Sequence, residues 1–200
     1  AFMKGIHFND WIPFNLVPPR WGNYTPPVAD QSLKNLAATG ANWISLLVLG
    51  SQETVASTTI VRTQPRTATD AELLRVVKLA HSLGMRVALL PALYTFSNDP
   101  NHDWMQIGTA FASETQLQEW FASYREFINH YATFAKEAEV DLFYVGSELT
   151  GVTHREDDWR RIVREVRERY KGPISYDSLG GPVGDWKRIK WWDAVDYFAT

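Results

Sequence analysis

The stretch VDLFYVGSELT, residues 140–150, gives the clearest indication of the fold. The apolar and aromatic residues 142–145 favour a buried β-strand, and Gly146 marks its end. Glu148 follows two residues later, so its carboxylate is placed at the carboxyl end of the strand. In parallel α/β folds, ligands bind and catalytic groups lie at this edge of the sheet. Glu148 is therefore the first candidate for a catalytic residue.

The rest of the chain alternates short apolar runs with segments of helical period. We expect strands at 3–8, 42–49, 86–93, 141–145, 173–178 and 194–200. We expect helices at about 30–39, 69–83, 113–138 and 159–170. The second of these helices opens with Thr69 and Glu72 at the spacing of a capping box.

This alternation is typical of an α/β fold with a parallel sheet. We predict a (β/α)8 TIM barrel in a single domain over residues 1–200, because long loops follow the strands. A complete barrel typically needs about 250 residues. About six βα units are accounted for, so we expect the chain to lack the last two strands. An open doubly wound sheet is the alternative.

The composition restricts the classes of function. The formal net charge of -3 gives no basic surface for nucleic acid, so we expect no nucleic-acid partner. No apolar run approaches the roughly 18 residues that a membrane span needs. Disulfides and cysteine-ligated zinc are excluded, because the chain has no cysteine. The oligomeric state is undetermined, and so is the compartment, with a secreted or cell-surface location slightly favoured over a cytoplasmic one.

Aromatic residues are abundant, with nine Trp, eight Tyr and ten Phe, and several lie in loop-like stretches. Sugars bind through their apolar faces, which stack on aromatic rings, and through hydroxyls that meet carboxylates and amides. Packing of these rings against the barrel rim is the alternative. The residues expected to bind or position a carbohydrate are Asp10, Trp11, Tyr94, Trp104, Ser147, Tyr176 and Asp177, and Trp21 also suits stacking.

Cleavage of a glycosidic bond usually needs two carboxyl groups. Besides Glu148, the strand-end acids are Asp10 and Asp177, and neither suits the role of nucleophile. We expect Asp10 to bind a hydroxyl and Asp177 to orient a neighbour. A structural Glu148, which caps the following turn or pairs with an arginine such as Arg155, is the alternative to a catalytic one.

The loop 98–103 contains several side chains that could ligate a metal. Its ligating residues are Asn98, Asp99, Asn101, His102 and Asp103, but their spacing fits neither a calcium loop nor a zinc motif. We expect no metal and no cofactor. A metal-dependent hydrolase that uses this loop is the weaker hypothesis.

Several segments together resemble glycoside hydrolase family 113. They are MKGI (3–6), GANWI (40–44), AHSLGMRV (80–87), WFASY (120–124) and GSEL (146–149), with the helix 159–170 and the segment 191–197. The resemblance implies a retaining (β/α)8 glycosidase that acts on β-mannans. It also implies that Glu148 is the general acid/base and that the nucleophile is a second glutamate on the seventh strand, beyond Thr200.

Two positions depart from the pattern. The third strand ends in Leu90-Pro91-Ala92, where the family commonly has a Lys-Pro-His type sequence. Ser147 precedes the acid, where the wider clan often has Asn. Both positions lie near the expected sugar, so these departures concern which sugar is bound and not the glycosidase chemistry.

The sequence thus predicts a retaining glycoside hydrolase that acts on a β-mannan-like polysaccharide or oligosaccharide. We expect the 200-residue chain alone to be inactive, because its nucleophile lies elsewhere. A non-catalytic carbohydrate-binding or scaffold barrel, in which Glu148 is only a hydrogen-bond partner, is the alternative.

Overall fold

The computed structural model describes residues 3–9, 24, 26–62, 67–95, 104–182 and 184–200. Six strands form one parallel sheet in the order in which they occur along the chain. They are β1 (Gly5–Phe8), β2 (Trp43–Gln52), β3 (Arg86–Thr95), β4 (Leu142–Ser147), β5 (Ile174–Asp177) and β6 (Tyr197–Ala199). The α-helices are α1 (Val28–Ala38), α2 (Asp70–Ser82), α3 (Glu114–Glu137) and α4 (Glu156–Arg169).

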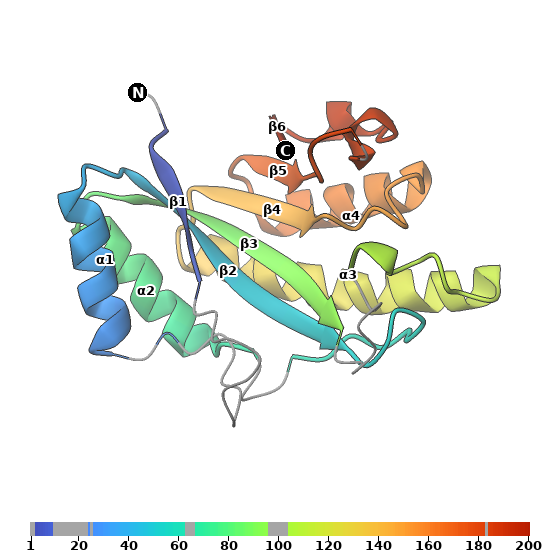
Figure 1. Cartoon of the computed structure of the whole chain (residues 1–200), viewed down its shortest axis with the longest axis horizontal. Coiled ribbons are helices and arrows are strands. Elements are labelled where there is room, and N and C mark those ends of the chain that lie inside the picture. The colour runs from blue at the N-terminus through green and yellow to red at the C-terminus, as the bar shows by residue number, and fades with distance from the viewer. Residues whose placement is uncertain (1–2, 10–23, 25, 63–66, 96–103, 183) are drawn as a thin grey trace.

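The sheet is curled, and the helices cover its outer face (Figure 1). Each of the first four strands is followed by one α-helix. This is the arrangement of six consecutive strands of a (β/α)8 barrel, which does not close within this chain. The predicted fold class is confirmed.

The connection from β5 to β6 contains no α-helix. It is made instead by the short 3-10 turns η2 (Asp185–Lys187) and η3 (Trp192–Ala194). Gly180, Gly181 and Pro182 follow β5 closely, and these residue types disfavour a helix at this point.

Helices α2 and α3 begin with side-chain caps, and that of α2 is the predicted capping box. The Thr69 hydroxyl accepts from the backbone N–H of Glu72, and the Glu72 carboxylate accepts from the backbone N–H of Thr69 at 2.8 Å. At the start of α3, the Ser113 hydroxyl accepts from the N–H of Gln116. These caps satisfy backbone donors that would otherwise lack partners.

An aromatic layer fills the space between the sheet and helices α3 and α4. Its members are Trp120, Tyr124, Trp159, Tyr176 and Trp191, and all of them are fully buried. Trp120 stacks on Tyr124 with ring centroids 5.0 Å apart, and Trp159 stacks on Trp191 at 4.9 Å. No helix within the described ranges is long and apolar enough to cross a membrane.

The two outer strands leave apolar side chains uncovered. Ile6 in β1 is 52% exposed, and Tyr197 and Phe198 in β6 are 57% and 54% exposed. Each of these strands pairs on one side only. Unpaired strand edges with apolar side chains favour association with other chains.

We therefore expect the 200-residue chain to bind the dye ANS and to self-associate at micromolar concentration. The double variant I6K/Y197K should show weaker dye fluorescence and a smaller mass in light scattering, because it places charge on both edges. The control is V28K, since Val28 is exposed on helix α1 away from the edges. If V28K lowers dye fluorescence and mass as much as I6K/Y197K does, the strand edges are not the cause of the association.

Candidate active site

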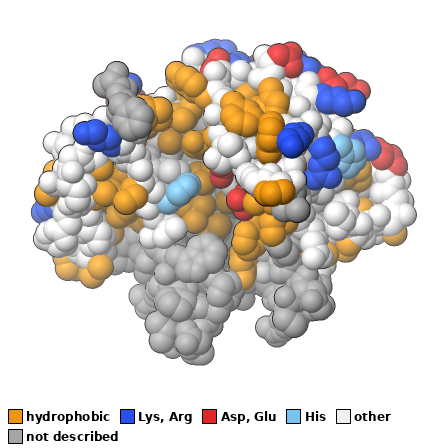
Figure 2. All heavy atoms as spheres, turned by 45° about the horizontal axis from the view of Figure 1, so that its top comes forward, with side chains coloured by type: hydrophobic (Ala, Val, Ile, Leu, Met, Phe, Trp, Pro, Cys, Tyr) orange, Lys and Arg blue, Asp and Glu red, His pale blue; other side chains and the backbone are white. Residues whose placement is uncertain are grey.

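A cavity of about 210 Å³ opens at the carboxyl ends of the strands. The predicted residues Tyr94, Trp104, Ser147, Glu148 and Asp177 all line it. Figure 2 shows acidic and histidine side chains beside apolar ones near the middle of this face. The structure therefore brings together residues that lie up to 83 positions apart in the sequence, from 94 to 177.

The cavity has one apolar side and one polar side. Strands β2 and β3 contribute the apolar side, which consists of Leu47, Leu49, Leu90, Ala92 and Leu93. Strands β1, β4 and β5 and the residue after β4 contribute His7, Ser147, Glu148 and Asp177. A pyranose ring has the same division between C–H faces and hydroxyl edges, so the cavity suits such a ring.

His7 was not among the predicted site residues. It pairs in register with Ser45 of β2 and lies one residue before the end of β1. The alternation of side chains along a strand was the available signal, because it places His7 and not Phe8 toward the cavity.

Glu148 lies directly after β4 in a left-handed backbone conformation, with φ of 51°. Its side chain accepts a hydrogen bond from the indole N–H of Trp104, with Nε1 and Oε2 3.1 Å apart. A left-handed non-glycine residue costs on the order of 1–3 kcal/mol, and it persists where neighbouring contacts impose it. Glu139 shares this conformation just after α3, where helices often end in it, so φ alone does not mark function.

Backbone hydrogen bonds hold the Glu148 turn. The N–H of Glu148 donates to the carbonyl of Asp177 at 2.8 Å. The N–H of Leu149 donates to the Tyr176 hydroxyl at 2.9 Å. Both partners come from the end of β5, so this strand fixes the backbone on which the candidate acid is carried.

Tyr176, which was expected to stack on a sugar or to position it, does not line the cavity. It is fully buried and lies edge-on to Trp159 and Trp191. Burial raises the pKa of its phenol well above the usual value. Its hydroxyl accepts a hydrogen bond from the backbone N–H of Leu149, so Tyr176 positions the backbone next to Glu148.

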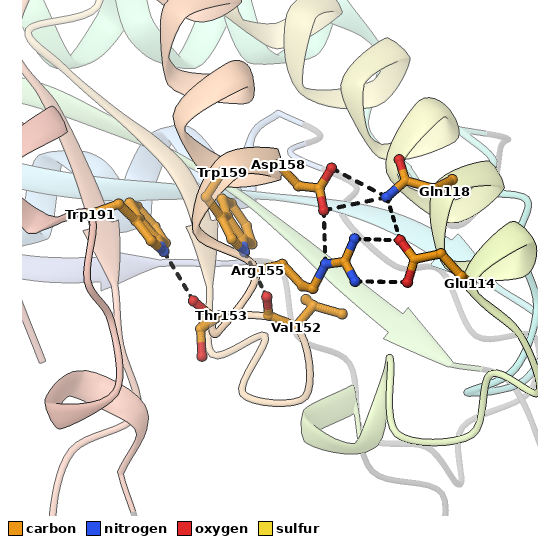
Figure 3. Close-up of polar contacts among 8 residues, drawn as sticks. All are labelled: Glu114, Gln118, Val152, Thr153, Arg155, Asp158, Trp159 and Trp191. Atoms are coloured by element: carbon orange, nitrogen blue, oxygen red, sulfur yellow. Dashed lines mark hydrogen bonds and ion pairs between the residues drawn. The ribbon is translucent and has the colours of Figure 1, made fainter.

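The loop after β4 is anchored to the aromatic layer. The indole N–H groups of Trp159 and Trp191 donate to the carbonyls of Val152 and Thr153, each at 3.0 Å (Figure 3). Gly151 lies so close to the carbonyl of Ile107 that a β-carbon there would collide with it. This close approach keeps the turn that carries Trp104 next to the loop that follows Glu148.

Arg155 pairs with carboxylates other than that of Glu148. Its guanidinium contacts both carboxylate oxygens of Glu114, at 2.8 and 2.5 Å, and that of Asp158 at 2.9 Å (Figure 3). The ion pairs join the start of α3 to the start of α4. The hydrogen bond from Arg155 lowers the pKa of Glu114 to about 2.

The remaining predicted residues have different placements. Asp177 accepts a hydrogen bond from the Ser147 hydroxyl at 2.8 Å, and burial raises its pKa. Burial also raises the pKa of Tyr94. Asp10, Trp11 and Trp21 and the loop 98–103 lie outside the described residues. Within the described ranges, no group of three or more His, Asp or Glu residues could hold a metal ion.

Gly146 is required by the packing under the site. The pairing of β4 with β5 is irregular between Tyr144 and Ser147, and the Tyr124 hydroxyl donates to the carbonyl of Val145 at 2.8 Å. A β-carbon on Gly146 would lie 2.6 Å from that hydroxyl oxygen and 3.2 Å from the Trp159 ring. Neither neighbour can move freely within the aromatic layer.

We expect Gly146→Ala to destabilise the fold by about 1–3 kcal/mol, because it overpacks a buried contact. Chemical denaturation checks this. Gly5→Ala is the control, since a β-carbon there would meet Trp43 at an ordinary 3.5 Å. The double variant G146A/Y124F should recover part of the loss, and an undisturbed G146A protein would contradict the packing model.

The Glu114–Arg155 pair should make stability depend on acid pH. Because the pKa of Glu114 is lowered on folding, its contribution is complete above about pH 4.5 and is lost as the pH falls through about 2. The melting temperature of Glu114→Gln should therefore lie below that of the parent near neutral pH and approach it near pH 2. Glu119→Gln changes an exposed acid on the same helix and should show no such convergence.

Comparison with solved structures finds two β-mannanases of family 113. The chain is similar to the β-mannanase AaManA of family 113 from Alicyclobacillus acidocaldarius, solved in complex with ManMIm. The identity is 28% and the TM-score 0.83, over 99% of this chain and 60% of that one. A second β-1,4-mannanase of family 113, also solved as a complex, gives 27% and 0.82, over 98% and 61%. This chain thus spans about three fifths of the length of these mannanases.

A more distant structure shares the fold alone. It is the exo-β-1,4-mannosidase Op5Man5 from Opitutaceae bacterium strain TAV5, with 16% identity and a TM-score of 0.52 over 86% of this chain and 31% of that one. No curated protein sequence matches. The model of Glycoside Hydrolase Family 113 matches residues 13–200. The chain belongs to glycoside hydrolase family 113.

Proposed function

We propose that this chain forms the acid/base side of the active site of a retaining glycoside hydrolase that acts on β-mannan. The carrying observation is the position of Glu148, whose carboxylate meets the Trp104 indole in a cavity with one apolar and one polar side. Membership of family 113 and the similarity to mannanases support this choice of substrate.

The sugar ring is proposed to lie across the cavity. Its C–H face packs on the leucines of β2 and β3, with Tyr94 and Trp104 as aromatic contacts. The Ser147 hydroxyl donates its one hydrogen bond to the Asp177 carboxylate. Ser147 can therefore only accept a hydrogen bond from a sugar hydroxyl. Asp10 and Trp11 are retained as proposed sugar contacts.

Glu148 is proposed to act twice. As an acid it protonates the oxygen of the leaving sugar, and as a base it later takes a proton from water. The retaining mechanism needs a second carboxylate about 5–5.5 Å from the first. As the resemblance to family 113 implies, we propose that the nucleophile is a glutamate beyond Thr200.

The test replaces Glu148 by Ala in the full-length gene product. Hydrolysis of mannooligosaccharides should fall by about 10²–10⁴-fold, because the leaving sugar is no longer protonated. Hydrolysis of 2,4-dinitrophenyl β-mannobioside should persist at its first step, since that leaving group needs no proton. Added azide should then raise turnover and yield a β-glycosyl azide.

The control is Glu139→Gln, which changes an exposed glutamate with the same left-handed backbone far from the cavity. It should keep full activity. Unchanged turnover in Glu148→Ala would exclude the acid/base role. Binding of mannooligosaccharides by the parent protein without any turnover would support the non-catalytic barrel instead.

A further inference from the structure

We propose that Asp177 is a positioning residue that sets the orientation of the Glu148 carboxylate. This inference rests on the proposed role of Glu148 as general acid/base. Asp177 contacts the chain around Glu148 twice: its carboxylate accepts from the Ser147 hydroxyl at 2.8 Å, and its carbonyl accepts from the Glu148 N–H at 2.8 Å.

The end of β4 needs such support. Its pairing with β5 breaks between Tyr144 and Ser147 and resumes only where Ser147 pairs with Asp177. The next residue, Glu148, then adopts the left-handed conformation. At this point the regular ladder no longer specifies the backbone, so individual hydrogen bonds must hold it.

The last two residues of β5 supply these bonds in sequence. The Asp177 side chain holds Ser147, the Asp177 main chain holds Glu148, and the Tyr176 hydroxyl holds Leu149. Three consecutive residues are therefore fixed from one strand end. Of these contacts, the bond to Ser147 is the one that a substitution of the Asp177 side chain removes.

A half-buried carboxylate at this place is itself informative. Asp177 and His7 both line the site cavity. Both also line a second cavity of about 240 Å³. Burial raises the pKa of Asp177, while the Ser147 hydrogen bond and the facing His7 partly offset this. The charge of Asp177 in turn contributes to the raised pKa of Tyr144. Removing a charged group from water costs free energy unless it is hydrogen-bonded, so the presence of Asp177 here indicates that its hydrogen bonds are needed.

The geometry predicts a specific kinetic signature. Displacement of a catalytic group by about 1 Å can cost on the order of 10²-fold in rate. A misplaced acid affects only those substrates whose leaving group must be protonated. Loss of Asp177 should therefore resemble a weaker form of loss of Glu148, and it should not resemble a general loss of binding.

The test compares Asp177→Ala, Asp177→Asn and Ser147→Ala in the full-length gene product. For mannooligosaccharides, Asp177→Ala and Ser147→Ala should lower kcat by about 10–10²-fold. For 2,4-dinitrophenyl β-mannobioside, the rate of the first step should stay within a few-fold of the parent. Asp177→Asn should recover most of the activity, because its amide oxygen still accepts from Ser147.

Other outcomes overturn the inference. Equal losses on both substrates would indicate a structural role, and a raised KM with unchanged kcat would indicate direct sugar binding. The double variant E148A/D177A should be no slower on mannooligosaccharides than E148A alone, and an additive loss would contradict action through Glu148. If Asp177→Ala does not fold, Ser147→Ala removes the same hydrogen bond; because Ser147 is also a proposed sugar contact, the dependence of its kcat on the leaving group, and not its KM, decides the question.

Failure of this inference is distinguishable from failure of the proposed function. If Glu148→Ala retains full activity on both substrates, the acid/base assignment falls. If Glu148→Ala shows the leaving-group dependence and the Asp177 and Ser147 variants do not, only the positioning role falls.

Discussion

The face-to-face contact between Trp159 and Trp191 is the packing interaction on which the site depends. Trp159 lies on helix α4, and Trp191 directly precedes η3. The contact therefore joins the helix that follows β4 to the connection between β5 and β6. Both indole N–H groups then reach the loop after β4, and Tyr176 packs against both rings. The apolar layer and the hydrogen bonds thus specify one position for the chain around Glu148.

Much of the fold was predictable from local signals. The capping residues Thr69 and Ser113 define where helices begin, and apolar periods define the strands. These signals are short-range, so one sequence carries them. The placement of Glu148, Ser147 and Asp177 in one cavity followed from a topological rule, because parallel strands bring their carboxyl ends to the same edge.

Other features depend on long-range packing and were not predictable. Tyr176 was expected to contact a sugar, but its ring points into the aromatic layer, because residues alternate sides along β5 and Asp177 takes the cavity side. Strand alternation places His7 on the cavity side of β1, but its proximity to Asp177 becomes visible only when the curled sheet brings β1 across from β5. The left-handed backbone of Glu148 depends on partners from β5, which no neighbouring residue indicates.

The close approach of Gly151 to Ile107 has a consequence for how this family can vary. Gly108 is similar, because a β-carbon there would collide with the Val152 side chain. The Thr150 hydroxyl also donates to the carbonyl of Met105 at 2.8 Å. The described segment 104–109 before α3 and the loop after β4 therefore interlock, so a change in one displaces the other. An insertion in one of them would move the other, so natural variation in substrate range at this rim should arise as paired changes in the two loops.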